Sequence, residues 1–292
     1  MTEKSNNPED NVGELQRQLW VCAKRSRARR FHALYDRICR SDVLQEAWKR
    51  VKKNRGSAGV DAITLTAIEE YGVSRFLDEV GANLRAGQYR AQPVKRRYIP
   101  KGNGKLGTRP LGIPTVRDRE VQMATKLIME PIFEADFLPS SYGFRPKKSA
   151  TQALEAIREA GNRGHNFVLD ADSRSYFDTI DQDKLMEKVK ERLSDRRVLK
   201  LIRQWLKAGV MEDGTVRETL AGTPPGGVIS PLRANIYLHE LDRTWAEKHQ
   251  SLGVLVRYAD DLVVMSQRES QAKEAFRQVS HIMGQLGLTL HP

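Results

Sequence analysis

The strongest constraint on the fold comes from residues 254–265, where two apolar, β-prone runs flank a short polar centre. Runs of this kind joined by a few polar residues are typical of a β-hairpin with buried strands. The polar centre contains Asp260 and Asp261. A second extended segment, residues 167–172, alternates apolar and polar side chains and ends in acidic residues, so it is a candidate neighbouring strand.

Most of the remaining sequence is patterned for helices. Apolar residues recur at helical spacing in the segments 41–51, 76–84, 117–130, 149–160, 181–193, 195–208, 230–245 and up to about 286. The expected N-caps are Ser41, Thr66 and Ser149. Further extended segments are expected at 94–99, up to Ile113, around Asp213-Gly214 and at 288–290. These patterns predict an α+β fold, in which helices pack on a central, largely antiparallel sheet.

The chain has a formal net charge of +12 over 292 residues, and its cations are concentrated in the first half. This excess favours an anionic partner, most often nucleic acid, although a basic protein without such a partner has the same composition. Arg25, Arg29 and Arg30 lie among aromatic residues, a mixture suited to phosphate contact and base stacking. The alternative is a solvated helix face whose aromatic stripe, including Trp20 and Phe31, is buried. For the region as a whole we favour RNA binding, because arginines with few acidic neighbours repel one another.

Cysteine use and hydropathy favour an intracellular protein. Cys22 and Cys39 form no Cys-x-x-Cys pair and have no histidine at zinc-ligand spacing, so we expect reduced thiols. The polar, acidic N-terminus lacks the apolar core of a signal peptide, and no apolar run is long enough for a membrane span. We therefore expect a cytoplasmic protein without membrane contact, whose residues 1–12 form a disordered tail.

The acidic residues of the two predicted strands suit metal binding. A two-metal site holds divalent ions roughly 3.5–4 Å apart, and its shared ligands are short, hard and anionic. Alternation along the second strand places Asp170 and Asp172 on one face, and Asp260 with Asp261 adds two carboxylates. An Asp-Asp pair alone is more often a simple turn. However, adjacent anions held by buried strands repel each other unless a cation compensates, and the second acidic strand end strengthens the metal-binding interpretation.

Five segments resemble, in the same order, sequence blocks of the reverse transcriptases and maturases encoded by bacterial group II introns. They are residues 109–119, 141–146, 172–178, 222–238 and 258–261. The resemblance extends from about residue 13 to the end of the chain, and five ordered blocks are far more specific than one tetrapeptide.

The resemblance implies the fingers and palm of a right-hand polymerase, with an antiparallel palm sheet, packed helices and a basic helical N-terminal extension. The implied domains are the extension at 13–90, the fingers at 91–165 and the palm at 166–292. Residues 286–292 match the point where the family continues into a thumb and a maturase domain. We therefore expect a palm that is incomplete and a chain that is cut short.

The implied function is RNA-directed DNA synthesis for a group II intron, a mobile element, by a nucleotidyltransferase that uses two Mg²⁺ ions. The implied partners are the intron RNA, an RNA template with a DNA primer, and dNTPs. The alternative is a truncated maturase remnant that binds RNA and does not polymerise. The oligomeric state stays open.

The resemblance assigns roles to individual acidic residues. The implied ligands of the two Mg²⁺ ions are Asp172, Asp260 and Asp261. Asp170 is a candidate only for an indirect role beside them. Asp178 and Asp181 are expected to cap the following helix and not to bind metal.

The nucleotide-binding roles fall on other segments. Lys101 and Arg109 are implied to contact the incoming triphosphate, for which the planar guanidinium is well suited. The loop between them is longer than usual in the family, so Lys105 is an alternative to Lys101. Phe177 corresponds to the side chain that crowds the 2′ position of the sugar and favours deoxynucleotides; it is also expected to serve as a core aromatic.

Three departures from the family pattern concern nucleotide handling and packing. Pro225, next to the implied nucleotide-binding Gly226, replaces the usual glutamine and so removes both an amide side chain and a backbone N–H. Residues 173–175 introduce polar side chains beside the metal strand. Arg233 replaces leucine on a helix, where it is expected either to extend to solvent or to lower stability.

Overall fold

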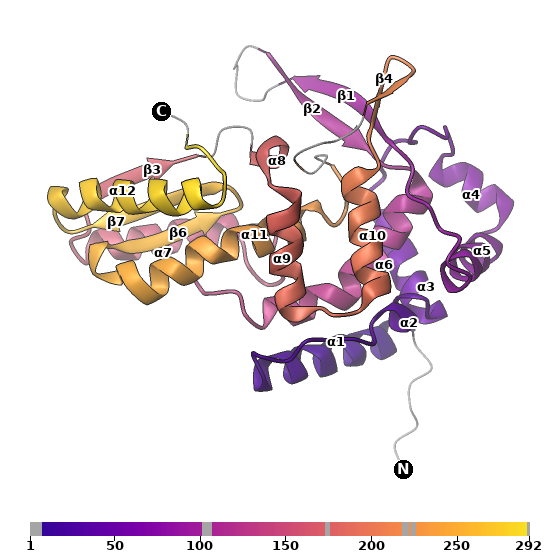
Figure 1. Ribbon diagram of the computed structural model, residues 1–292, viewed down its shortest axis with the longest axis horizontal. Coiled ribbons are helices and arrows are strands. Elements are labelled where there is room, and N and C mark those ends of the chain that lie inside the picture. Colours follow the sequence, from indigo (N-terminus) through magenta and orange to yellow (C-terminus); the bar gives the residue numbers. More distant parts are fainter. Residues whose placement is uncertain (1–7, 101–106, 173–175, 218–221, 223–225, 291–292) are drawn as a thin grey trace. The chain divides into compact units, whose positions relative to one another are not determined.

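The computed structural model describes residues 8–100, 107–172, 176–217, 222 and 226–290 (Figure 1). The chain divides into two compact units: the first comprises residues 1–136 and 189–230, and the second comprises residues 137–188 and 231–292. The domain boundaries predicted at residues 91 and 166 do not coincide with these units. Residues 189–230 belong to the first unit, in which Asp195 caps the starts of two helices.

Asp195 connects distant parts of the first unit. Its carboxylate accepts hydrogen bonds from the backbone N–H groups of Leu34 and Tyr35, both at 2.9 Å, at the start of one helix. It also accepts from the backbone N–H of Arg197 at 3.0 Å, as the N-cap of another. One carboxylate thus satisfies the free N–H groups of two helix starts, which a sequence pattern does not reveal.

The α-helices of the first unit include one long, buried helix, α6. They are α1 (Pro8–Arg25), α2 (Tyr35–Ile38), α3 (Ser41–Lys53), α4 (Leu65–Tyr71), α5 (Val73–Arg85), α6 (Val116–Glu134) and α10 (Arg196–Lys207). Helix α6 is buried along most of its length and contacts α1, α2 and α3. It continues past the predicted end at residue 130, with Pro131 inside it. Helix α1 begins within the predicted disordered tail, because Val12 is buried in the core.

A four-stranded sheet completes the first unit, in the order β2-β1-β4-β5. Its strands are β1 (Val94–Pro100), β2 (Thr108–Ile113), β4 (Val210–Glu212) and β5 (Thr215–Arg217). The β1–β2 and β4–β5 pairs are antiparallel, the latter as predicted around Asp213-Gly214, whereas β1 and β4 pair in parallel.

The second unit is built on a three-stranded antiparallel sheet in the order β3-β7-β6 (Figure 1). The strands are β3 (Phe167–Ala171), β6 (Val254–Tyr258) and β7 (Asp261–Ser266). The α-helices are α7 (Ala150–Asn162), α8 (Tyr176–Thr179), α9 (Gln182–Arg192), α11 (Ser230–Thr244) and α12 (Glu269–Gln285). A π-helical turn (Trp245–His249) and a 3₁₀ turn (Gln250–Leu252) follow α11. Helices α7 and α12 contact the sheet. The predicted α+β fold with an antiparallel sheet is confirmed.

Some predicted local details are correct and others are wrong. Ser149 caps α7, as predicted, and forms a capping box with Gln152. Helix α4 is capped by Thr64 and not by Thr66. Ser41 is the first residue of α3 and makes no side-chain cap.

Arg233 does not extend to solvent. Its side chain is fully buried, and this burial lowers the pKa of its guanidinium to about 10. Of the two expected outcomes, a cost in stability is the one that a buried guanidinium favours. Within the described residues, no helix combines the length and the apolar character that crossing a membrane demands.

Candidate active site

The strand register gathers the predicted acidic residues on one face of the second unit's sheet. Ala171 pairs with Leu262, so the next residues on the two strands, Asp172 and Asp261, lie opposite each other. Asp170 lies two positions from Asp172 and therefore shares its face. These three carboxylates are on the exposed side, whereas Ala171 and Leu262 are buried on the other.

Asp260 joins this group from the turn that connects β6 to β7. Burial raises the pKa of the Asp260 carboxyl, and the charges of Asp261 and Asp172 raise it further; a hydrogen bond from its own backbone N–H and the positive charge of Arg257 lower it. Burial also raises the pKa of Asp261, and the charges of Asp172 and Asp170 add to this shift. The carboxylates therefore repel one another at short range, which identifies a candidate cation site.

The donor set fits divalent magnesium in chemistry. Aspartate oxygens are the hard, anionic ligands that Mg²⁺ prefers, and no soft ligand lies among them. Within the described ranges, however, no group of three or more His, Cys, Asp or Glu side chains is arranged to hold a metal ion as it stands.

The turn has an unusual backbone conformation. Tyr258 pairs with Asp261, which leaves Ala259 and Asp260 as the two turn residues. Ala259 has φ +60°, and Asp260 is not among the residues with positive φ. This is the pattern of a type II′ turn, whose first central position normally holds glycine. A Cβ on Gly143 would lie 2.2 Å from the Ala259 nitrogen, so only glycine fits beneath the turn.

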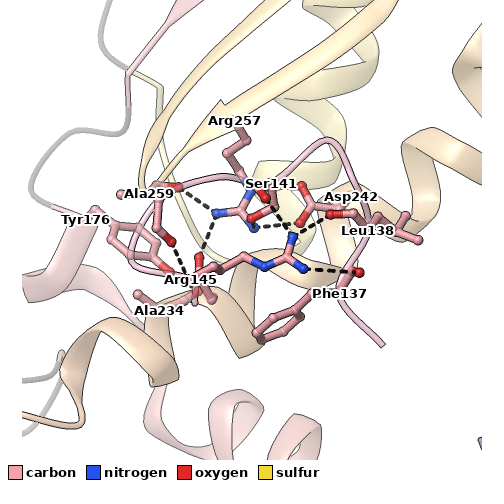
Figure 2. Close-up of polar contacts among 11 residues, drawn as sticks. Phe137, Leu138, Ser141, Arg145, Tyr176, Ala234, Asp242, Arg257 and Ala259 are labelled. Carbon is pink, nitrogen blue, oxygen red and sulfur yellow. Dashed lines mark hydrogen bonds and ion pairs between the residues drawn. The ribbon is translucent and has the colours of Figure 1, made fainter. Parts of the chain in front are cut away.

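A buried arginine lies behind the turn, on the core side of the sheet (Figure 2). The guanidinium of Arg257 is fully buried and forms a two-pronged ion pair with Asp242, from Nε to Oδ1 at 2.8 Å and from Nη2 to Oδ2 at 2.6 Å. Its other N–H groups donate to Asn235 Oδ1 at 3.1 Å, to the Ala259 carbonyl at 2.7 Å and to Ser141 Oγ at 2.7 Å. All five guanidinium donors are therefore used.

Sequence reasoning missed this network. It treated Arg257 only as part of an apolar strand, and it gave no role to Asp242 or Asn235. A usable signal was present, because a charged residue at a core-facing strand position needs a buried partner. Asn235 and Asp242 are about two helical turns apart and so lie on one side of α11, but the sequence does not show that this side faces Arg257.

The predicted nucleotide-binding residues belong mostly to the first unit, and the structure shows less of them. Lys101, Lys105 and Pro225 lie outside the described residues. The backbone of Arg109 is in β2, paired with Ile99, and that of Phe177 is in α8.

Gly226 has a clear structural reason to be glycine. Its φ is +102°, and a Cβ there would lie 2.3 Å from the carbonyl oxygen of Gly112. The backbone of this segment therefore packs directly on β2. Its nucleotide-binding role stays a prediction.

The predicted RNA-binding arginines are exposed at the end of α1 and in the segment after it. Arg25, Arg29 and Arg30 all face solvent, and the Arg29 guanidinium lies 5.3 Å from the ring centroid of Phe31. Trp20 is 41% exposed, whereas Phe31 is 6% exposed. Of the two predicted aromatic roles, Trp20 thus suits base stacking and Phe31 belongs to the core.

The raised pKa values predict how stability depends on pH. A folded-state pKa above the usual 3.8 means that the folded protein binds the proton more tightly than the unfolded chain does. Stability is therefore lost as pH rises from about 3.8 through the raised pKa of Asp260. Without divalent ions, Asp260→Asn should be more stable than wild type at pH 7, by up to about 1 kcal/mol, and this gain should shrink at lower pH.

Urea unfolding in EDTA at pH 7 and pH 4 measures this difference. The exposed Asp183→Asn variant is the control, since its carboxylate lies outside the cluster and should change stability little at either pH. If wild type is more stable than Asp260→Asn at pH 7, the inferred repulsion among the aspartate carboxylates is contradicted.

Known proteins resemble this chain in sequence and in fold. The reverse transcriptase (RNA-dependent DNA polymerase) family matches residues 99–292. Protein YkfC of Escherichia coli (strain K12) is 38% identical over 82% of this chain and 64% of its own length. The group II intron-encoded protein LtrA of Lactococcus lactis subsp. cremoris is 38% identical over 73% of this chain and 35% of its own. The solved structure of a partial Cas6-RT-Cas1–Cas2 complex shares the fold, with a TM-score of 0.51 at 23% identity over 86% of this chain and 42% of that one.

The chain therefore belongs to the reverse transcriptase family, in its group II intron-encoded branch. It spans about two thirds of the length of YkfC and about one third of that of LtrA.

Proposed function

We propose that this chain is the RNA-directed DNA polymerase of a group II intron and that Asp172, Asp260 and Asp261 hold its two Mg²⁺ ions. One observation carries the proposal: the register of β3 and β7 brings Asp172 and Asp261 to one exposed edge, next to the turn that carries Asp260. A protein that only bound RNA would gain nothing from carboxylates clustered where a polyanion must approach.

The chemistry follows from the donor set. Bound divalent ions supply Lewis acidity to the attacking 3′-hydroxyl and to the departing pyrophosphate. Asp172, Asp260 and Asp261 would hold these ions and balance part of their positive charge. Arg109, with Lys101 or Lys105, would bind the triphosphate, and Phe177 would restrict the 2′ position of the sugar. The exposed Arg25, Arg29 and Arg30 would contact the phosphates of the intron RNA.

The other partners and the compartment belong to the same proposal. The substrates would be an RNA template with its DNA primer, and dNTPs. Cys22 and Cys39 are free thiols, which fits the expected reducing environment of the cytoplasm.

A second candidate function is supported by one feature of the sequence. Pro225 replaces the usual glutamine of the nucleotide-binding block, so the chain could be a maturase remnant that binds RNA without polymerising. Primer extension on an RNA template with dNTPs and Mg²⁺, measured beside RNA binding by the same protein, separates the two functions. Extension that EDTA abolishes supports the polymerase; tight RNA binding without extension supports the remnant.

We predict that Pro225 weakens nucleotide use. Proline supplies neither a side-chain amide nor a backbone N–H, so Pro225→Gln restores up to three hydrogen-bond donors, two on the amide and one on the backbone. The apparent KM for dNTPs should fall by about 10-fold, as expected for about 1.4 kcal/mol of added binding. Steady-state extension at varied dNTP concentration measures this change. An unchanged or higher KM contradicts the prediction.

A further inference from the structure

The turn that carries Asp260 needs support from outside itself. Ala259 adopts a positive φ that favours glycine, and a side chain at such a position is strained. Such a conformation persists only where the surroundings hold it in place. Two groups do so here: the backbone of Gly143, which packs against the turn from below, and Arg257, whose Nη1 donates to the Ala259 carbonyl at 2.7 Å.

The bond from Arg257 reaches the Asp260 carboxylate through one rigid unit. The peptide group between Ala259 and Asp260 is planar, so its carbonyl oxygen and the N–H of Asp260 are fixed relative to each other. The Cα of Asp260, which carries the carboxylate side chain, lies in the same plane. Fixing the carbonyl therefore fixes the point from which the carboxylate extends.

Arg257 is itself held firmly. Asp242 and Asn235 bind it from α11, and Ser141 binds it from the segment that precedes α7. Because all of its donors are used and the guanidinium is fully buried, it cannot rotate toward the turn or away from it without breaking an ion pair out of reach of water. Asn235 also donates to the Gly143 carbonyl at 2.8 Å, which ties the two supports of the turn together.

We propose that Arg257, held by Asp242, is a positioning residue that stabilises the left-handed Ala259 and so presents Asp260 and Asp261 to the metal ions. This inference rests on the proposed function, because it treats the turn as catalytic. Lysine does not replace Arg257 in this role, since a single ammonium group cannot bind Asp242 in two-pronged fashion and also reach the Ala259 carbonyl.

The test compares full-length Arg257→Lys with Arg145→Lys. Arg145 is a matched control: it is also buried, and its hydrogen bonds to the carbonyls of Leu138 and Ser141, both at 2.6 Å, go to residues outside the turn (Figure 2). Hydrogen exchange of peptides covering residues 257–262 reports the rigidity of the turn. Calorimetric titration with Mn²⁺ reports metal binding without any need for activity.

For Arg257→Lys we expect turn exchange to be about 10- to 100-fold faster and Mn²⁺ affinity to be about 10-fold weaker, as the loss of a charge-assisted hydrogen bond implies. Arg145→Lys should change neither by more than about 3-fold, within the usual range for a mild substitution. Should Arg257→Lys fail to fold, Asn235→Ala removes one acceptor, keeps the ion pair and should shift both readouts in the same direction.

Two results overturn the positioning role. One is a rate of hydrogen exchange in the turn that is unchanged in the folded variants. The other is an exchange rate that rises equally in Arg145→Lys. A wild type that never extends a primer, combined with the expected exchange and Mn²⁺ results, overturns the polymerase proposal and leaves the positioning role supported.

Discussion

Replacing Asp260 or Asp261 with asparagine should lower primer extension by roughly 10³-fold or more, equivalent to about 4 kcal/mol of transition-state stabilisation. The amide keeps the size of the side chain but removes the negative charge, so a divalent ion loses an anionic ligand. Asp172→Asn should act in the same way, because Asp172 lies opposite Asp261 across β3 and β7. Single-turnover extension with Mg²⁺ at saturating dNTP measures the rate.

The control for this loss is Asp183→Asn, an equally conservative change at an exposed position of α9. It should leave extension within about 3-fold of wild type. RNA binding should be equal in all four variants, since the proposed role of the aspartates is to bind metal ions and not the RNA backbone. Extension by Asp260→Asn at a rate near that of wild type would contradict the proposed two-metal role of the aspartates.

Asp242→Ala should destabilise the second unit by about 3–5 kcal/mol, because it leaves the Arg257 guanidinium buried without a counter-charge. Neither side chain of this ion pair is exposed. A contrasting ion pair lies on the surface of the first unit, where Arg197 and Asp36 are 54% and 75% exposed. Asp36→Ala should therefore change the free energy of unfolding by less than about 1 kcal/mol.

Chemical unfolding followed by tryptophan fluorescence and by hydrogen exchange of α11 compares the two variants. The double variant Asp242→Leu with Arg257→Met should recover most of the lost stability, since it removes both charges from the interior. It should not recover extension, because the bond to the Ala259 carbonyl is also lost. Equal destabilisation by Asp242→Ala and Asp36→Ala would show that burial of the Arg257–Asp242 pair does not increase the cost of removing its acid.

Local sequence patterns predicted the elements that carry the site. The apolar runs of residues 254–265 predicted β6 and β7, and alternation in residues 167–172 predicted β3 with Asp170 and Asp172 on one face. These predictions succeed because side-chain alternation in a strand is a local property of the backbone. The start of α1 and the end of α6 were misjudged, because burial against other helices extends a helix beyond its own capping signals.

The interactions that sequence could not predict join residues far apart in the chain. Asp195 stands at the predicted start of the helical segment 195–208, yet its carboxylate also accepts hydrogen bonds from the N–H groups of Leu34 and Tyr35. Arg257 lies in a run that predicted only an apolar strand, yet five acceptor atoms of four other residues surround its guanidinium. Which acid meets which arginine depends on how α11 packs against the sheet, and a single sequence does not record that packing.

The sequence by itself determined the class of fold and the family, and it predicted Asp172, Asp260 and Asp261 as candidate metal ligands. It could do so because side-chain period and motif order are properties of neighbours in the chain. Only the tertiary structure decided that Asp172 lies opposite Asp261 and that a buried arginine holds the turn between β6 and β7. Strand register and the pairing of buried charges are set by packing, where a polar group removed from water must find its partner in whatever segment the fold brings beside it.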